Sequence, residues 1–198
     1  EYLSSAPKYD LLYRAFGWDV PVYVHCSPVM RDAQNKMSKR HGDPSYEDLR
    51  AQGFLTEAIL NYVALLGWSP RGDIAEQEVF SLQELAKAFD LAGMSKSPAI
   101  FDIEKLTHFN AIYLRAMTPE AFADAARPYI RQAVQREDIS AADVAALLQA
   151  RCEKLTDIPE KVDFFDALPD YDVNLFANKK SKSTLDSSRE MLSAAIGM

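Results

Sequence analysis

Residues 35–43 read NKMSKRHGD, and this polar stretch divides the sequence into two parts with different patterns. It places Lys36, Lys39 and Arg40 around Ser38, between two apolar segments. The part before it combines a helical pattern with one β-branched run, whereas the part after it has apolar residues at helical spacing throughout. The sequence therefore predicts a mainly α-helical fold with a small amount of sheet near the N-terminus.

The segment before the polar stretch is expected to hold one helix and one strand. Ser5-Ala6-Pro7 is followed by apolar residues at helical spacing, which predicts a helix that ends at Gly17. The run from Val20 to Val24 is rich in β-branched residues and is therefore predicted to be a strand. His25 follows this run, and we expect it to be a partly buried histidine and not a catalytic base.

Capping signals mark the helices of the second part. Ser45 with Asp48, and Ser81 with Glu84, have the spacing of a capping box, in which a hydroxyl and an acid three residues later exchange hydrogen bonds with the backbone. Further helices are expected to start at Thr56, Asp102, Thr118, Ser140, Ile158 and Thr184. The helix that starts at Ile158 is expected to reach Leu168.

The composition is that of a folded protein with an acidic surface. Of the 198 residues, 48% are hydrophobic and 26% are charged, and the net charge is −7. Such a chain can bury a core in one or two compact units. Its charge argues against binding nucleic acid over its whole surface, so a polyanion would have to meet local basic patches. The acidic stretch at 157–172 should repel phosphate.

The cysteines and the ends of the chain indicate the cellular setting. Cys26 and Cys152 lie far apart and lack zinc-ligand spacing, which favours a reduced, cytoplasmic setting without bound zinc. No apolar run approaches the roughly 20 residues that span a membrane. Because the chain begins Glu1-Tyr2-Leu3 without an initiator methionine, and ends just after an apolar helical pattern, we expect a fragment of a longer protein.

The polar stretch has the residue types that bind nucleotide phosphates. Two ammonium groups separated by Met37 and Ser38 on a short, flexible, glycine-ended loop can close over a phosphate chain, and the hydroxyl and loop amides can donate hydrogen bonds. Such groups offset negative charge that develops as a phosphoryl or nucleotidyl bond changes. A solvated basic turn is the alternative, and it is the commoner meaning of an arbitrary K-x-S-K match.

The order of several separate blocks favours the phosphate-binding interpretation. The blocks are SSAPKYDLLYRAFGW, KMSKRHGD, LRAQGFLTEAILNYVALLGWSP, FSLQELAKAFDL and SKSPAIFDIEKLTHFNAIYL. Over most of residues 1–115 this order closely resembles the bacterial glutamyl-tRNA synthetases, a family of class I aminoacyl-tRNA synthetases. Members of that family have a Rossmann catalytic half with an H-I-G-H type signature and a second signature, K-M-S-K-S or a variant. Residues 36–40, KMSKR, match the second signature, and the first is absent from the chain.

The resemblance implies three parts in the chain. Residues 1–42 would be the C-terminal part of a class I Rossmann catalytic domain, with the KMSKR loop. Residues 43–115 would be a helical connector that contacts the tRNA stem, and residues 116–198 would be the first part of a helical anticodon-binding domain. The N-terminal catalytic half, which holds the glutamate pocket, would lie outside the chain.

The resemblance also implies an activity and its partners. The parent enzyme would be a cytoplasmic, monomeric glutamate–tRNA ligase that activates L-glutamate with ATP and Mg²⁺ and transfers it to the 3′ end of tRNA(Glu). These 198 residues alone are then expected to be inactive. A free-standing tRNA-binding or accessory module derived from a synthetase remains the alternative. A tRNA-modifying enzyme without an anticodon domain is disfavoured by the long helical second half.

The resemblance assigns roles around the loop. Lys39 is expected to contact ATP phosphate directly with help from Lys36 and Ser38, while Met37 packs the loop and Arg40 matches an alternative ending of the signature. Further candidates for the nucleotide site are Tyr2, Val29 and Met30. The family more often has Trp at the position of Tyr2, where an aromatic face lies by the adenosine and the tRNA 3′ end. The other two would border the adenine through backbone groups.

Five basic residues are candidates for contact with tRNA. Lys96 lies in a segment that resembles a tRNA-facing part of the connector, although an exposed turn lysine would look the same. Arg127 and Arg131 come at near-helical spacing, and the family reads anticodon bases with arginine. A solvated helix face is the alternative for both. Lys179 and Lys180 belong to a small basic run that would attract the phosphate backbone without specificity.

Overall fold

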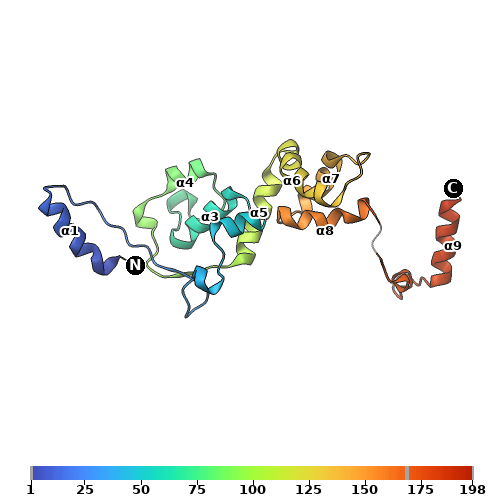
Figure 1. The fold of residues 1–198 in the computed structure, drawn as a ribbon, viewed down its shortest axis with the longest axis horizontal. Helices are drawn as coiled ribbons and strands as arrows, with labels where there is room; N and C mark the ends of the chain where they lie inside the picture. The colour runs from blue at the N-terminus through green and yellow to red at the C-terminus, as the bar shows by residue number, and fades with distance from the viewer. Residues whose placement is uncertain (1, 168–169, 198) are drawn as a thin grey trace.

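The computed structural model describes residues 2–167 and 170–197, which are mainly α-helical as predicted (Figure 1). The helices are α1 (Ala6–Ala15), α2 (Tyr46–Ala51), α3 (Thr56–Gly67), α4 (Leu82–Ala88), α5 (Ile103–Ala116), α6 (Pro119–Ala133), α7 (Ala141–Leu148), α8 (Ile158–Val162) and α9 (Leu185–Ile196). Two short strands, β1 (Val29–Met30) and β2 (Ala99–Ile100), pair in parallel. The elements are spread along one long axis, with α1 near one end, α9 near the other and the remaining helices between them.

Most helix starts agree with the capping signals. Ser45 and Ser81 complete capping boxes at the starts of α2 and α4. Asp102, Thr118, Ser140 and Thr184 also accept backbone hydrogen bonds at their helix starts. Thr56 is an exception, because α3 begins at Thr56 itself and no side chain caps it. Its hydroxyl instead lies 2.9 Å from the Tyr46 hydroxyl.

The predicted strand from Val20 to Val24 is wrong. Residues 18–28 have no regular secondary structure, and β1 begins only at Val29. A β-branched run becomes a strand only where a neighbouring strand completes its hydrogen bonds. Among the described residues, no strand lies beside this segment. His25 is exposed there, so the expectation that it is partly buried is also wrong.

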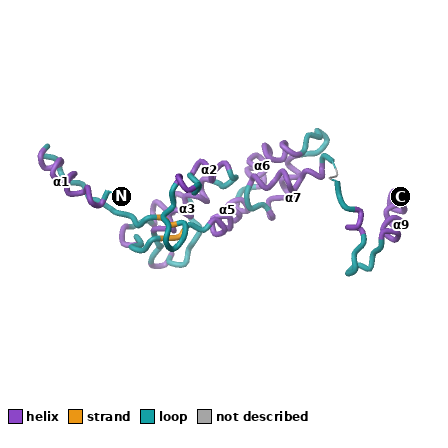
Figure 2. Tube along the Cα trace, turned by 60° about the horizontal axis from the view of Figure 1, so that its bottom comes forward, coloured by secondary structure: helices purple, strands orange, loops and turns teal. Residues whose placement is uncertain are grey.

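The helices α2 to α5 enclose one apolar core. It consists of Leu49, Phe54, Ile59, Tyr62, Leu106 and Phe109, with a smaller cluster of Trp68, Phe80 and Leu85 beside it. Asn61 is fully buried, donates to the carbonyl of Glu78 at 2.7 Å and accepts from the amide of Phe80 at 2.9 Å. These bonds fix the segment before α4 against α3, and the two strands lie near α3 on the same unit (Figure 2).

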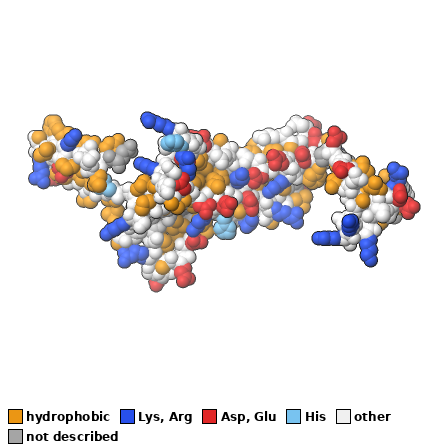
Figure 3. Space-filling view, turned by 90° about the horizontal axis from the view of Figure 1, so that it is seen from below, with side chains coloured by type: hydrophobic (Ala, Val, Ile, Leu, Met, Phe, Trp, Pro, Cys, Tyr) orange, Lys and Arg blue, Asp and Glu red, His pale blue; other side chains and the backbone are white. Residues whose placement is uncertain are grey.

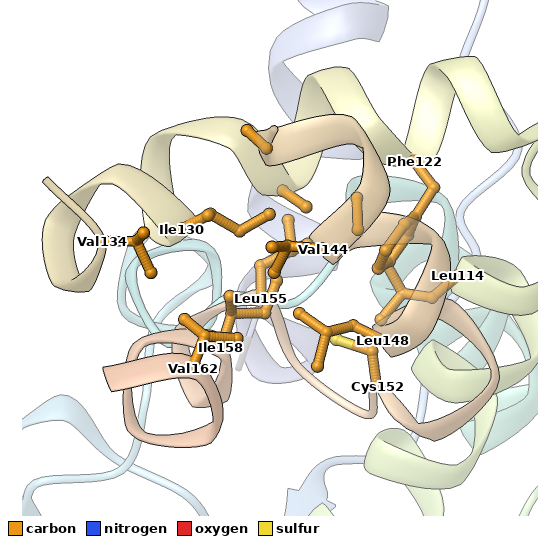
Figure 4. Close-up of a cluster of buried hydrophobic side chains, with 13 residues drawn as sticks. Leu114, Phe122, Ile130, Val134, Val144, Leu148, Cys152, Leu155, Ile158 and Val162 are labelled. Atoms are coloured by element: carbon orange, nitrogen blue, oxygen red, sulfur yellow. The ribbon is translucent and has the colours of Figure 1, made fainter. Parts of the chain in front are cut away.

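A second apolar core lies between the end of α5 and the helices α6, α7 and α8 (Figure 4). Leu114 of α5 and Phe122 of α6 meet at one end, and Ile130, Val144 and Ile158 continue the cluster. All of these side chains are buried. The second half of α5 therefore belongs to this core, while its first half belongs to the core of the preceding helices.

Hydrogen bonds join the two cores around α5. The side chain of Asn110 is fully buried, accepts from the amide of Leu55 at 2.8 Å and donates to the carbonyl of Glu153 at 2.6 Å. The hydroxyl of Thr156 donates to the carbonyl of Gln52 at 2.7 Å. Because buried amides satisfied on both sides are costly to disrupt, these contacts hold the two helical units together.

The outer helices are packed differently from the middle of the chain. Neither α1 nor α9 contains a buried residue. The helix α8 is shorter than predicted, since a 3-10 turn replaces it at Asp163–Phe165. Its predicted end at Leu168 lies outside the described residues. Among the described residues, no helix has both the length and the apolar character needed to cross a membrane.

Candidate functional site

The KMSKR stretch lies on a loop that leaves β1 and ends at α2. The amide of Phe101, just after β2, donates to the carbonyl of Met30 at 2.8 Å, which fixes the start of the loop. The carboxylate of Asp32 then accepts from the amide of Asn35 at 2.8 Å, and Lys36 returns opposite Met30 as an antiparallel bridge. The first half of the loop is thus a closed turn that brings the first lysine back to the strand.

The second half of the loop is a single 3-10 turn, Lys39–His41. The Ser38 hydroxyl caps it by accepting from the amide of Arg40 at 3.3 Å. Gly42 ends the turn with a φ of 79°, in the left-handed region that glycine adopts without a side-chain clash. The carboxylate of Asp43 then accepts from the amide of Ser38 at 2.6 Å. The serine and the second lysine are therefore held by a compact turn.

Arg31 and Asp43 close the loop from its two ends. The Arg31 Nε atom lies 2.8 Å from Oδ1 of Asp43, and its Nη2 atom lies 2.9 Å from Oδ2. This is the bidentate geometry of a strong arginine–carboxylate pair. The hydrogen bond from the Ser38 amide, followed by that from Arg31, holds the pKa of the Asp43 carboxyl below its usual value. Expected to be flexible from its sequence, the loop is fastened by these contacts.

The two signature lysines are available for a ligand. Neither Lys36 nor Lys39 forms an ion pair with a carboxylate of the described residues. Both are exposed and, with Met37 and Ser38 between them, line a hollow of about 840 Å³. The Ser38 hydroxyl only accepts in its hydrogen bond to Arg40, so its own proton is free to be donated.

A second hollow, of about 680 Å³, lies on the other side of the loop against α2. Lys39 lines this hollow too, but here it faces Asp43 and Asp48. The hydrogen bond from the Ser45 amide, and to a smaller extent the charge of Lys39, hold the pKa of the Asp48 carboxyl below its usual value. Arg31 also lines the second hollow and offsets the charge of Asp43, but Asp48 remains there to repel phosphate. A phosphate chain is therefore better suited to the first hollow, which both lysines line.

Of the remaining candidates for the nucleotide site, Tyr2 lies apart from the lysines, whereas Val29, Met30 and Arg40 adjoin them. Tyr2 is 64% exposed and is not among the residues that line either hollow. Val29 and Met30 lie in β1, and their carbonyls already accept from the amides of Met37 and Phe101. Arg40 is exposed on the 3-10 turn. The structure therefore brings Lys36, Met37, Ser38 and Lys39 together, but not Tyr2.

The lysines that are candidates for contact with tRNA are exposed and lie in two separate turns. Lys96 is exposed in a turn, and its own backbone carbonyl accepts from the Ser27 hydroxyl at 2.9 Å. Lys179 and Lys180 are exposed in a second turn, between Asn178 and Ser183. On the face seen in Figure 3, Lys and Arg side chains stand out at separate places and do not form one continuous basic surface. Each group is thus suited to a local contact.

The two arginines of α6 make contacts within the chain. Arg127 pairs with Asp124 at 2.8 Å on the exposed face of the helix. Arg131 donates to three backbone carbonyls beyond the helix end, at 3.0 to 3.3 Å, namely those of Val134, Arg136 and Ile139. Since those carbonyls lack partners within the helix, the guanidinium of Arg131 stabilises the turn after α6.

Arg31 and Asp43 are site residues that the sequence did not indicate. Only their positions in the sequence could have indicated them. Arg31 directly follows β1, and Asp43 directly follows the glycine that ends the 3-10 turn. Which carboxylate pairs with which guanidinium depends on two successive turns of the backbone. No group of three or more His, Cys, Asp or Glu side chains that could hold a metal ion occurs among the described residues.

Comparison with known proteins identifies relatives of the whole segment. The chain is 50% identical over 192 residues to a glutamate–tRNA ligase of Clostridium botulinum, covering 97% of this chain and 39% of the relative. It is 47% identical over 196 residues to a glutamate–tRNA ligase of Clostridium tetani, covering 99% of this chain and 39% of the relative. The chain thus spans about two fifths of the length of the curated relatives it matches.

Solved structures and family models agree with these relatives. The crystal structure of a glutamate tRNA ligase from Elizabethkingia meningosepticum in complex with its amino acid superposes with a TM-score of 0.73 and 28% identity, over 100% of this chain and 47% of that chain. Residues 121–198 match the model of an anticodon binding domain. Residues 1–108, more than half of the sequence, match the catalytic-domain model of the tRNA synthetases class I (E and Q), and the chain belongs to this family.

Proposed function

We propose that the chain is part of a glutamate–tRNA ligase, which activates glutamate with ATP and transfers it to the 3′ end of tRNA(Glu). The observation that carries the proposal is the KMSKR loop, whose two lysines line one hollow without ion pairs to the described carboxylates. Because the chain spans only 39% of the Clostridium botulinum ligase, the complete activity belongs to a longer protein. This segment would contribute the ATP-phosphate loop and tRNA-binding helices.

The loop would act on the charge of the phosphates. When the glutamate carboxylate attacks the α-phosphorus, the adenylate forms and the bond to pyrophosphate breaks, so negative charge grows on the leaving oxygens. Lys39 and Lys36 would offset that charge with their ammonium groups, and the Ser38 hydroxyl would donate a hydrogen bond. This is electrostatic stabilisation by groups already in place, without transfer of a proton. ATP would enter as its magnesium complex, and the metal would share the same charge.

Other residues would serve the nucleotide and the tRNA from separate places. The exposed ring of Tyr2 offers a stacking face for the adenosine or for the tRNA 3′ end. Residues 43–115 would contact the tRNA stem, with Lys96 at a phosphate. In residues 116–198, Lys179 and Lys180 would attract the phosphate backbone. Arg127 would leave its pair with Asp124 to reach RNA.

The test is charging of tRNA by the full-length protein that contains this chain. Purified protein is incubated with ATP, Mg²⁺, total tRNA and one radiolabelled amino acid, and the labelled tRNA is counted. We expect charging with glutamate, and only background with aspartate. If no amino acid is charged while tRNA binding is retained, the accessory-module alternative replaces the ligase.

A further inference from the structure

The turn that carries Lys39 is tied to the rest of the chain by one side chain. Within the turn, the amides of Arg40, His41 and Gly42 donate to Ser38 and Lys39. Among the hydrogen bonds of the described residues, the one from the Ser38 amide to Asp43 is the only bond that leaves residues 38–42. The place of the turn relative to β1 and α2 therefore depends on where the Asp43 carboxylate is held.

Arg31 determines where that carboxylate is held. Its guanidinium makes two contacts, at 2.8 and 2.9 Å, to the two oxygens of Asp43. The Asp43 side chain is only 12% exposed, so water competes weakly for these oxygens, whereas Arg31 is 40% exposed. The backbone of Arg31 is itself fixed, because its amide donates to the carbonyl of Asn35 at 2.8 Å. A continuous chain of contacts thus runs from β1 through Arg31 and Asp43 to Ser38.

This chain of contacts ends between the two lysines of the signature. The backbone of Lys36 is fixed by its bridge to Met30, so its side chain extends from a residue beside β1. Lys39 starts from the 3-10 turn, whose position follows Ser38. The position of Lys39 relative to Lys36 therefore depends on Asp43. This relative position decides how well the two ammonium groups match a triphosphate. Small errors of position in such groups cost large factors in rate.

We propose that Arg31 and Asp43 are positioning residues for glutamate activation, in which Asp43 anchors the KMSKR turn through the Ser38 amide and Arg31 orients Asp43. The proposal rests on the proposed function, because it concerns the step in which pyrophosphate leaves. It assigns no contact with substrate to either residue. Its consequence is specific: loss of the pair should weaken adenylate formation, but not the later transfer of glutamate to tRNA, since pyrophosphate has then departed.

The experiment uses the full-length protein and measures the two steps separately. Activation is followed by ATP–pyrophosphate exchange with tRNA present, and transfer is followed from purified glutamyl adenylate to tRNA. The variants are Asp43→Asn, Arg31→Gln, the double variant and the conservative Arg31→Lys. We expect kcat for exchange to fall roughly 10- to 100-fold in Asp43→Asn, as for loss of a hydrogen-bonded charge. The KM for glutamate and the transfer rate should stay within about twofold of wild type.

The double variant and the conservative variant distinguish a pair from two separate effects. If the residues act together, Arg31→Gln combined with Asp43→Asn should be no slower than the slower single variant. Arg31→Lys keeps the charge but loses the bidentate geometry, so its exchange rate should lie between wild type and Arg31→Gln. Rate losses that multiply in the double variant would overturn the coupling of the two residues.

A matched control is the second bidentate pair, Arg136 with Asp138. Its contacts are similar, with Nε at 3.1 Å from Oδ1 and Nη2 at 2.6 Å from Oδ2, but it lies after α6. Asp138→Asn should leave the exchange rate within about twofold of wild type. The positioning role is overturned if Asp43→Asn also stays within twofold, or if exchange, transfer and thermal stability fall together. Wild-type protein that activates no glutamate would overturn the proposed function, and the positioning role with it.

Discussion

Burial gives the two cysteines different chemistry at the scale of single residues. Cys26 is exposed in the irregular segment before β1, whereas Cys152 is buried in the second core. Burial raises the pKa of the Cys152 thiol to about 11. Reaction with a thiol reagent requires the thiolate, so Cys152 should be inert in the folded chain. The unfolded chain loses this proton more readily, and Cys152 should therefore make the folded state less stable as pH rises above about 9.

We predict that an aromatic disulfide reagent at pH 8 labels one thiol per chain in native buffer and two in denaturant. The fast thiol is Cys26, and Cys26→Ser should abolish native labelling without changing the signal from Cys152 after unfolding. The release of chromophore with time is the measurement. Two fast thiols in native buffer would show that the second core opens readily around Cys152.

At this scale the sequence indicates the signature residues as candidates, but not the residues that hold their loop in place. KMSKR is contiguous, so its two ammonium groups and its hydroxyl can be recognised in the sequence. The pairing of Arg31 with Asp43 follows from two tight turns that bring the ends of the loop together. Arg131 illustrates the same limit, because its helical spacing does not reveal that three carbonyls beyond α6 occupy its guanidinium.

At the scale of elements, local signals predicted the helices well, whereas the strand failed because it needs a distant partner. The caps at Ser45, Ser81 and Asp102 depend only on residues two or three positions away, and they occur as expected. The strand pair forms instead between Val29–Met30 and Ala99–Ile100, which are far apart in the sequence. No periodicity within either dipeptide indicates that pairing.

Gly53 lies where the two helical cores meet, and its substitution gives a prediction for the stability of the fold. Its φ is 87°, and a Cβ atom built there would lie 2.7 Å from the amide nitrogen of Thr156. A side chain would meet both backbone strain and the neighbouring backbone, so Gly53→Ala should lower the free energy of unfolding by about 2 to 3 kcal/mol. Urea unfolding of this chain followed by circular dichroism is the measurement.

Gly72 provides the matched control for that substitution. It has a φ of 66°, but nothing lies within 4 Å of a Cβ atom built there. Gly72→Ala should therefore show backbone strain alone, about 1 kcal/mol. Equal losses for the two variants would mean that the contact between Gly53 and Thr156 is not a close one in solution.

At the scale of the whole molecule, a chain with a net charge of −7 would have to bind RNA through local cations. Lys179 and Lys180 are exposed, whereas Lys105 lies 3.3 Å from the carboxylate of Glu78. We predict that tRNA binding by this chain weakens with salt, and that Lys179→Gln with Lys180→Gln makes the log–log slope shallower by about 1 to 2. Lys105→Gln should change the slope little. Filter binding at several salt concentrations is the measurement. An unchanged slope in the double variant would show that these lysines do not contact RNA phosphates.

The cations of the KMSKR loop are proposed to stabilise the charge that develops as pyrophosphate leaves ATP. The measurement that decides this role is ATP–pyrophosphate exchange by the full-length protein, with tRNA and glutamate present, for wild type and Lys39→Ala. We predict that kcat falls by about 10²- to 10³-fold while the KM for glutamate stays within about twofold, as for removal of a group that acts mainly in the transition state. An exchange rate within threefold of wild type would contradict the claim.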